Sequence, residues 1–180
     1  YNVSNKGWRV MARLSGVLRD RLISGLSGVN NNSGARGVVE VLIQWVMECE
    51  GEVRREPFLS YGFDLMVNMD GRLDEYPFAE IGEADVERVY SRATQLRNAS
   101  DDGVAQFVRD LMEELVAVEI DRVCSRCGEA YMRAYMGLIS FTPAFQCDVC
   151  GYGEFLNGAA LKGERLRFIT LKELESFEIY

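Results

Sequence analysis

Two pairs of cysteines are the residues best suited to chemistry in this chain, because their spacing is that of a metal site. Cys124 and Cys127 form one C-x-x-C pair, and Cys147 and Cys150 form a second. Four thiolates in two tight turns are the ligand set of a structural zinc site, in which each pair supplies two sulfurs. A glycine follows each pair and lets the chain reverse without a Cβ clash. The spacing therefore predicts one four-cysteine zinc site.

The chain has no histidine among its 180 residues, and this removes several classes of chemistry. Neither a Ser-His-Asp triad nor a Cys-His pair can form, and most catalytic zinc sites also need histidine. The fifth cysteine, Cys49, lies in an apolar run and is expected to be a buried, inert thiol. An enzyme here would depend on Asp, Glu, Lys, Tyr, Cys or a cofactor, so the sequence favours a protein that is not an enzyme.

Length and composition are those of an ordinary globular protein, with 48% hydrophobic and 27% charged residues. No apolar run approaches the ~18 residues that span a bilayer. The chain begins at Tyr1 without a methionine, and no leader of basic and then apolar residues is present. The cysteine pattern is also unlike that of secreted disulfide frameworks. These features favour a cytoplasmic protein without membrane contact.

Charge is distributed unevenly along the chain, whose net charge is −8. Residues 1–55 carry eight basic and five acidic side chains, residues 56–121 carry five and sixteen, and residues 122–180 carry seven of each. An acidic middle repels phosphate and attracts a basic surface, although a solvated face that keeps the protein soluble would have the same composition. The carboxylates predicted to contact a basic partner are Asp64, Asp70, Asp74, Glu75, Asp110, Glu113 and Glu114.

The elements that must position these groups are predicted from hydrophobic periodicity. Helices are predicted at residues 8–26, 35–50, 83–97 and 101–120. The β-branched residues of the second segment also permit a buried strand there. Residues 59–69 carry large side chains at every odd position and Asp70-Gly71 follows, so a β-hairpin is predicted, with 72–77 as its return strand.

The C-terminal third is predicted to be mostly strands. They are expected at residues 130–136, 138–141, 153–156 and 165–169. Thr170 and Glu173 fit a capping box that opens a terminal helix. The predicted fold class is therefore α+β. A predominantly helical body with one β-hairpin occupies residues 1–121, and a four-cysteine subdomain with a C-terminal strand and helix, packed on the body, occupies residues 122–180.

The two cysteine turns resemble the knuckles of the zinc-ribbon family over roughly residues 122–156. This resemblance implies two β-hairpins holding one structural zinc, and it leaves the first two-thirds of the chain unassigned. The first turn, with Tyr131 four residues after its second cysteine, is also similar to that of rubredoxin-type iron proteins. Asp148 stands where their second turn usually has proline. Redox iron is therefore the alternative to structural zinc.

The favoured function is a non-enzymatic, acidic protein-binding module that engages a basic partner. In size, acidity and lack of catalytic groups the chain is similar to the immunity proteins of bacterial toxin systems, which cover the active surfaces of nucleases or other basic toxins.

Two other functions remain open. Zinc ribbons also bind nucleic acid, so a transcription-associated protein is the alternative, although the acidic middle disfavours it. Its phosphate contacts would come from Arg122, Arg126, Arg133, Arg165 and Arg167. The third function is an enzyme of unknown chemistry that uses carboxylates near Tyr61, Asp64 and Glu75.

Overall fold

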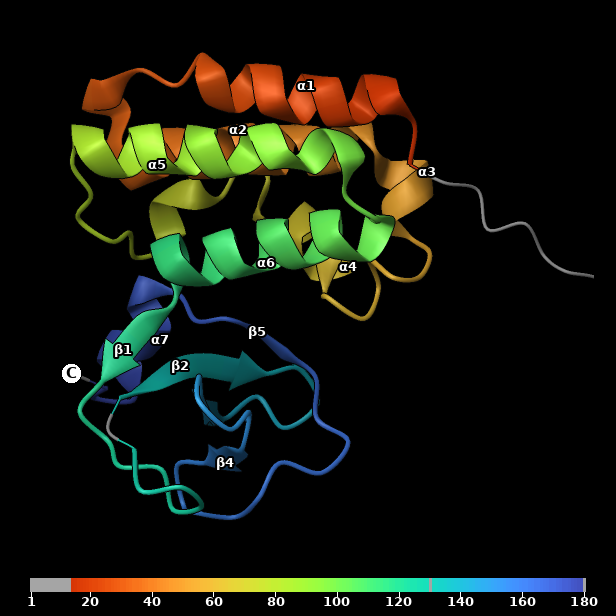
Figure 1. Cartoon of the computed structure of the whole chain (residues 1–180). Coiled ribbons are helices and arrows are strands. Elements are labelled where there is room, and N and C mark those ends of the chain that lie inside the picture. The colour runs from red at the N-terminus through yellow and green to blue at the C-terminus, as the bar shows by residue number, and fades with distance from the viewer. Residues whose placement is uncertain (1–13, 130, 180) are drawn as a thin grey trace, which may run out of the picture.

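The computed structural model describes residues 14–129 and 131–179. Helices predominate in residues 14–117, called the helical body below, and a five-stranded antiparallel sheet dominates residues 118–179, called the sheet subdomain (Figure 1). The mixture of helices and sheet agrees with the predicted fold class in its coarse form. Among the described residues, none of the helices combines the length and apolarity needed to cross a bilayer.

Four long helices make up most of the helical body. They are α1 (Gly16–Ser27), α2 (Gly34–Glu48), α5 (Glu83–Thr94) and α6 (Asp101–Val116). Shorter helices connect them: η1 (Asn31–Ser33), α3 (Glu50–Val53), α4 (Phe63–Met66), η2 (Val67–Met69), η3 (Leu73–Glu75) and η4 (Gln95–Asn98). In Figure 1, α6 lies between the other three long helices and the sheet.

The helix predictions hold with shifted ends. Helix α2 confirms the helical interpretation of its segment over the strand alternative, and α5 with η4 covers the next predicted helix. Helix α1 covers the described part of the first prediction, and residues 8–13 lie outside the described residues. Ser100 caps α6 by accepting a hydrogen bond from the Gly103 N–H. The last turn predicted for α6 is wrong, because Ala117 is extended and residues 118–120 form a strand.

The predicted β-hairpin over residues 59–77 is wrong, because α4, η2 and η3 occupy the segment. Phe63, Met66 and Met69 are buried at a spacing of three, which is a helical period. Met66 adds one large apolar residue at an even position, so the segment fits a helix pattern as well as the strand pattern of its odd positions. Burial against the neighbouring helices selects the helical one.

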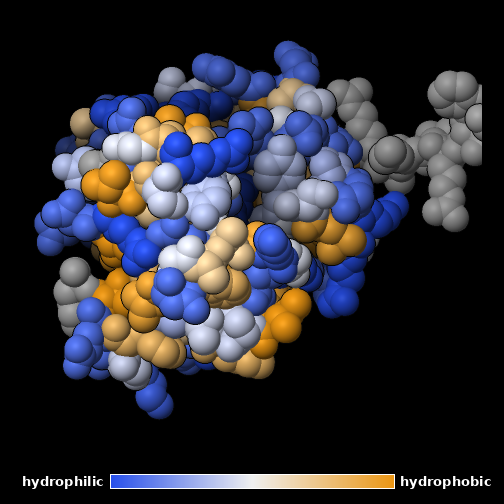
Figure 2. Space-filling model, turned by 90° about the horizontal axis from the view of Figure 1, so that it is seen from below, coloured by the Kyte–Doolittle hydropathy of each residue, from blue (hydrophilic) through white to orange (hydrophobic). Residues whose placement is uncertain are grey.

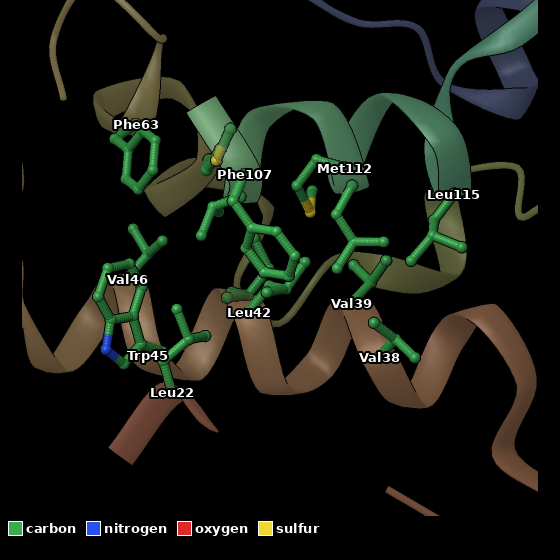
Figure 3. Packing of buried hydrophobic residues seen from close by; sticks show 14 of the residues in the cluster. Leu22, Val38, Val39, Leu42, Trp45, Val46, Phe63, Phe107, Met112 and Leu115 are labelled. Carbon is green, nitrogen blue, oxygen red and sulfur yellow. The ribbon is translucent and has the colours of Figure 1, made fainter. Parts of the chain in front are cut away.

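The core of the helical body forms mainly between α2 and α6 (Figure 3). In Figure 3, the side chains of Val39 and Leu42 on α2 lie toward Phe107 and Met112 on α6. The Nε1 of Trp45 donates a hydrogen bond to the carbonyl oxygen of Leu18 at 2.7 Å and so fixes α1 against α2. This core gives α6 a fixed position from which the sheet begins.

The sheet subdomain contains five short strands and one helix. They are β1 (Val118–Ile120), β2 (Met132–Gly137), β3 (Pro143–Cys147), β4 (Gly153–Phe155), β5 (Leu166–Phe168) and α7 (Leu171–Ser176). The strand order is β1-β2-β3-β4, and β5 pairs with β2 beyond β1 on the same edge. Thr170 and Glu173 form the predicted capping box of α7.

One strand prediction in this subdomain is wrong. Residues 138–141 form the turn between β2 and β3, while the strand itself starts at Pro143. Phe141 has a positive φ of 52°, which does not fit a strand, and the Gly137 N–H donates to the Thr142 carbonyl oxygen across the turn. The other three predicted strands are present with shifted ends.

The two faces of β2 belong to two different cores, because side chains alternate along a strand. Met132, Ala134 and Met136 pack into a small core within the sheet subdomain, which also buries Cys124. Tyr135 points to the opposite face and packs into the core of the helical body. The sheet is therefore joined to the helical body through one face and carries the cysteine site with the other.

Candidate metal centre

The structure brings the four predicted cysteine ligands together. Their Sγ atoms all lie within 4.8 Å of one another. The Sγ atoms of Cys124 and Cys150 are 3.6 Å apart, and so are those of Cys127 and Cys147. Four sulfurs bound to one zinc ion at about 2.3 Å would lie about 3.8 Å from each other, whereas a disulfide holds its sulfurs about 2.05 Å apart. The cluster therefore fits a single metal ion bound by four thiolates.

Both cysteine turns use the same backbone hydrogen bonds. In the first turn, the Gly128 N–H donates to the Cys124 carbonyl oxygen at 2.9 Å, and the Cys124 N–H donates to Glu129 at 2.8 Å. Gly151 and Cys147 repeat both bonds at the same sequence spacing in the second turn. Both glycines have a positive φ, which explains why each turn needs glycine at this position. The repeated geometry aims two pairs of sulfurs at one point.

The backbone also acts on the sulfur of the first ligand. The N–H groups of Cys127 and Arg126 lower the pKa of the Cys124 thiol. The thiolate is the form that binds metal, so these amides favour the ligand state. By contrast, burial raises the pKa of the Cys49 thiol to about 12. Cys49 lies in the core of the helical body, as the sequence predicted.

A buried carboxylate ties the first cysteine turn to β4. Glu154 accepts hydrogen bonds from Arg122 at 2.7 and 2.9 Å and from the hydroxyl of Ser125 at 2.7 Å. The guanidinium of Arg122 also lies 4.8 Å from the ring centre of Phe145. Sequence reasoning missed Glu154, because a single glutamate in a short strand belongs to no recognisable pattern. Glu154 therefore holds the first cysteine turn against β4, the strand that follows the second cysteine turn.

The arginines considered for phosphate contact are mostly paired with carboxylates. The pairs are Arg122–Glu154, Arg133–Asp148, Arg165–Asp64 and Arg167–Glu173. Arg126, on the first cysteine turn, is exposed. The five arginines therefore do not offer five unpaired positive charges to a phosphate backbone.

The seven carboxylates predicted to bind a partner fall into two groups. Asp64, Asp70, Asp74 and Glu75 lie on residues 62–76, which are called the acidic segment below, and the others lie on α6. Five of the seven are in ion pairs: Asp64–Arg165, Asp74–Arg36, Glu75–Arg72, Glu113–Arg109 and Glu114–Arg92. The remaining two are Asp70, which is exposed, and Asp110. Burial raises the pKa of Asp110, and the negative charges of Glu113 and Glu114 raise it further.

A cleft of about 1190 Å³ separates the acidic segment from β5 and α7. Asp74 and Glu75 line it from the helical body, and Leu138 and Leu166 line it from the sheet subdomain. A second cleft of about 490 Å³ lies beside the first and shares Gly62, Leu65, Arg109 and Leu166 with it. The boundary between the helical body and the sheet subdomain is therefore a groove lined by charges of both signs, with Arg72 and Arg109 beside Asp74 and Glu75.

The carboxylates considered for catalysis do not converge in this groove. Tyr61 donates a hydrogen bond to Asp102 at 3.2 Å, Asp64 pairs with Arg165, and Glu75 pairs with Arg72. Each of the three groups thus faces a different partner.

No family model matches the chain, and neither a curated protein nor a solved structure matches it at a significant level. The resemblance to a zinc ribbon therefore rests on the four clustered cysteines, which are compatible with such a site.

Proposed function

We propose that this protein is a non-enzymatic, acidic protein-binding module with a structural zinc at the four cysteines, and that it engages a basic protein partner. An immunity-type inhibitor of a basic toxin or nuclease is the form of this function that its size and acidity favour. The observation that carries the proposal is the acidic surplus of the helical body.

The ligand set supports a structural role for the metal. Four thiolates fill a tetrahedral zinc site and leave no position for water or substrate. The chain contains no histidine that could take part in an open site. Redox iron uses the same ligand set, and elemental analysis of the purified protein separates the two metals. Zinc is the expected metal.

The charge of the helical body supports a basic partner. Residues 14–117 carry ten basic and nineteen acidic side chains, whereas residues 118–179 carry seven and nine. A surplus of this size steers a basic protein toward the helical body and raises the rate of association. An acidic surface would also compete with nucleic acid for the basic groove of a nuclease.

The ion pairs disfavour the nucleic-acid alternative. A phosphate group that approached Arg133 or Arg165 would have to displace Asp148 or Asp64 from that arginine. The displaced carboxylate would remain beside the phosphate and repel it. Arg126 alone supplies too little charge for tight binding.

Two titrations at physiological salt test the proposal, one with fluorescent single- and double-stranded nucleic acids and one with a fluorescent lysine-rich peptide. We expect nucleic acids to bind no more tightly than ~10⁻⁴ M, and the peptide to bind more weakly as salt increases. Asp70→Lys should weaken peptide binding more than Glu87→Lys, a matched change at an exposed position on α5. Tight binding of a nucleic acid would contradict the proposal.

A further inference from the structure

The two cysteine turns are held in place differently, although their internal hydrogen bonds are the same. Cys147 is the last residue of β3 and pairs with Met132 on β2, so the sheet itself fixes the start of the second turn. The first turn, Cys124 to Gly128, lies between β1 and β2 and belongs to no strand. It therefore needs contacts of another kind to bring its two sulfurs to the cluster.

Apolar burial contributes little to holding the first turn. Cys124 is its only buried residue, and Val123, directly before the turn, is 60% exposed. Figure 2, which views the molecule from the side of the sheet subdomain, shows hydrophobic side chains in several places on the surface of this face. Hydrogen bonds are therefore the main contacts that can fix the turn before a metal binds.

The hydrogen bonds that leave the first turn end on one side chain. Among the described residues, and apart from the contacts between sulfurs, residues 121–129 bond to the rest of the chain only through the neighbouring Ile120 and through Glu154. Oε1 of Glu154 accepts from the guanidinium of Arg122, and Oε2 accepts from the hydroxyl of Ser125. We call Arg122, Ser125 and Glu154 the carboxylate clamp.

The sheet and the burial of its side chain fix Glu154 itself. The side chain is 4% exposed, and the residue lies on β4 directly opposite Phe145 on β3. The guanidinium of Arg122 lies 4.8 Å from the ring centre of Phe145, so this strand pair supplies both contacts of the guanidinium. A buried carboxylate is costly unless it is paired and hydrogen-bonded, and this cost keeps Arg122 and Ser125 against β4.

We propose that Glu154 is a positioning residue of the metal centre, which acts through Arg122 and Ser125 to hold Cys124 and Cys127 where they meet the second pair of ligands. The inference rests on the proposed structural zinc and names the side chain that sets the affinity of the site for it. A turn that is already in place loses less conformational entropy when the metal binds, so the carboxylate clamp raises that affinity.

The test measures the zinc affinity of the full chain by competition with a chromophoric chelator. Residues that fix metal ligands through hydrogen bonds typically change metal affinity 10–100-fold when they are replaced, so Glu154→Gln should bind zinc roughly tenfold or more weakly. Ser125→Ala should bind zinc roughly fivefold more weakly, whereas Ser125→Thr keeps the hydroxyl and should bind it normally. Adding Ser125→Ala to Glu154→Gln should have little further effect, because both changes break one contact.

Glu164→Gln is the matched control. The carboxylate of Glu164 also holds a turn, since it accepts hydrogen bonds from the N–H groups of Ile139 and Ser140 at 2.8 and 3.1 Å. This turn follows Gly137, whereas Cys147 pairs with Met132 at the opposite end of β2. The control should therefore bind zinc as tightly as the unmodified protein.

Each other outcome overturns a defined part of the proposal. If Glu154→Gln binds zinc normally, or if Glu164→Gln weakens binding as much, Glu154 is not a positioning residue and the structural zinc stands. If Glu154→Gln does not fold, the variants of the exposed Ser125 decide, because they leave the buried pair of Arg122 and Glu154 intact. Equal affinities of Ser125→Ala and Ser125→Thr would then overturn the proposal. If the unmodified protein binds no metal, the proposed structural zinc is wrong as well.

Discussion

The helical body and the sheet subdomain differ in what holds them together. Among the described residues, the main core contains 32 buried residues, nearly all from the helical body, whereas the sheet subdomain buries nine in its own core. Two of those nine, Cys124 and Cys147, belong to the four-cysteine cluster. Strands of three to six residues around so small a core rarely fold alone, and small scaffolds commonly use a metal to compensate.

This difference gives the two parts different sources of stability. The helical body can fold by apolar burial. We expect the sheet subdomain to depend on a metal at the four cysteines as well as on the packing of Tyr135 and Phe168 into the body's core. Loss of a metal from the four cysteines should therefore disrupt the sheet subdomain before it unfolds the helices.

The largest expected effect follows from Cys147→Ser. This change removes one of four ligands, and structural zinc contributes on the order of 10 kcal/mol or more to folding. We expect no bound zinc by elemental analysis and loss of the sheet, with the helical signal in circular dichroism largely kept. Cys49→Ala is the control and should retain one zinc per chain. Zinc bound to Cys147→Ser at the same stoichiometry would show that the cysteine site has been assigned incorrectly.

A smaller effect is expected from Arg19→Met in the helical body. Arg19 is a buried cation that pairs with Asp101 and donates to the Leu96 carbonyl oxygen at 3.2 Å. Removing one member of a buried pair leaves the other uncompensated and costs about 3–5 kcal/mol, to be measured by urea unfolding. Arg54→Met breaks an exposed pair with Glu50 and should cost about 1 kcal/mol or less. Equal costs would contradict this account of the helical body.

The smallest effect is expected from Asp110→Asn. Burial and nearby carboxylates raise the pKa of Asp110, so folding favours its protonated form, and its contribution to stability is lost as the pH rises through the folded pKa. At neutral pH the neutral asparagine should therefore stabilise the protein, by a few tenths of a kcal/mol because solvent screens this partly exposed group. Thermal unfolding of both proteins at pH 7 and at pH 4 measures this gain in stability. The gain should be smaller at pH 4, because more of the Asp110 in the unmodified protein is then protonated. A loss of stability at pH 7 would contradict the assignment.

The cysteine site was predictable from the sequence because its signal is local. Two C-x-x-C-Gly turns specify the ligands and the chain reversal within five residues each. The long helices were predictable for the same reason, since their apolar faces repeat over several turns. The capping box at Thr170 and Glu173 is also a pattern of four residues.

What the sequence did not predict depends on contacts between distant residues. The pairing of Arg165 with Asp64 joins residues 101 positions apart, and no local pattern indicates it. Val118 and Ile120 are apolar at positions that also extend α6, and only pairing with β2 makes them a strand. The hairpin predicted over residues 59–77 is wrong, because the segment fits both a strand period and a helical period. Burial of Phe63, Met66 and Met69 against other helices selects the helical period.

Hydrogen exchange of the zinc-loaded protein, with and without a zinc chelator, tests the central claim most directly. The chelator should remove protection from the amides of β2 and β3, while those of α2 and α6 stay protected, because only the sheet subdomain depends on the metal. Unchanged protection of the sheet after the metal has been removed, or protein purified from zinc-supplemented cells without bound metal, would contradict the claim that the four cysteines hold this subdomain together.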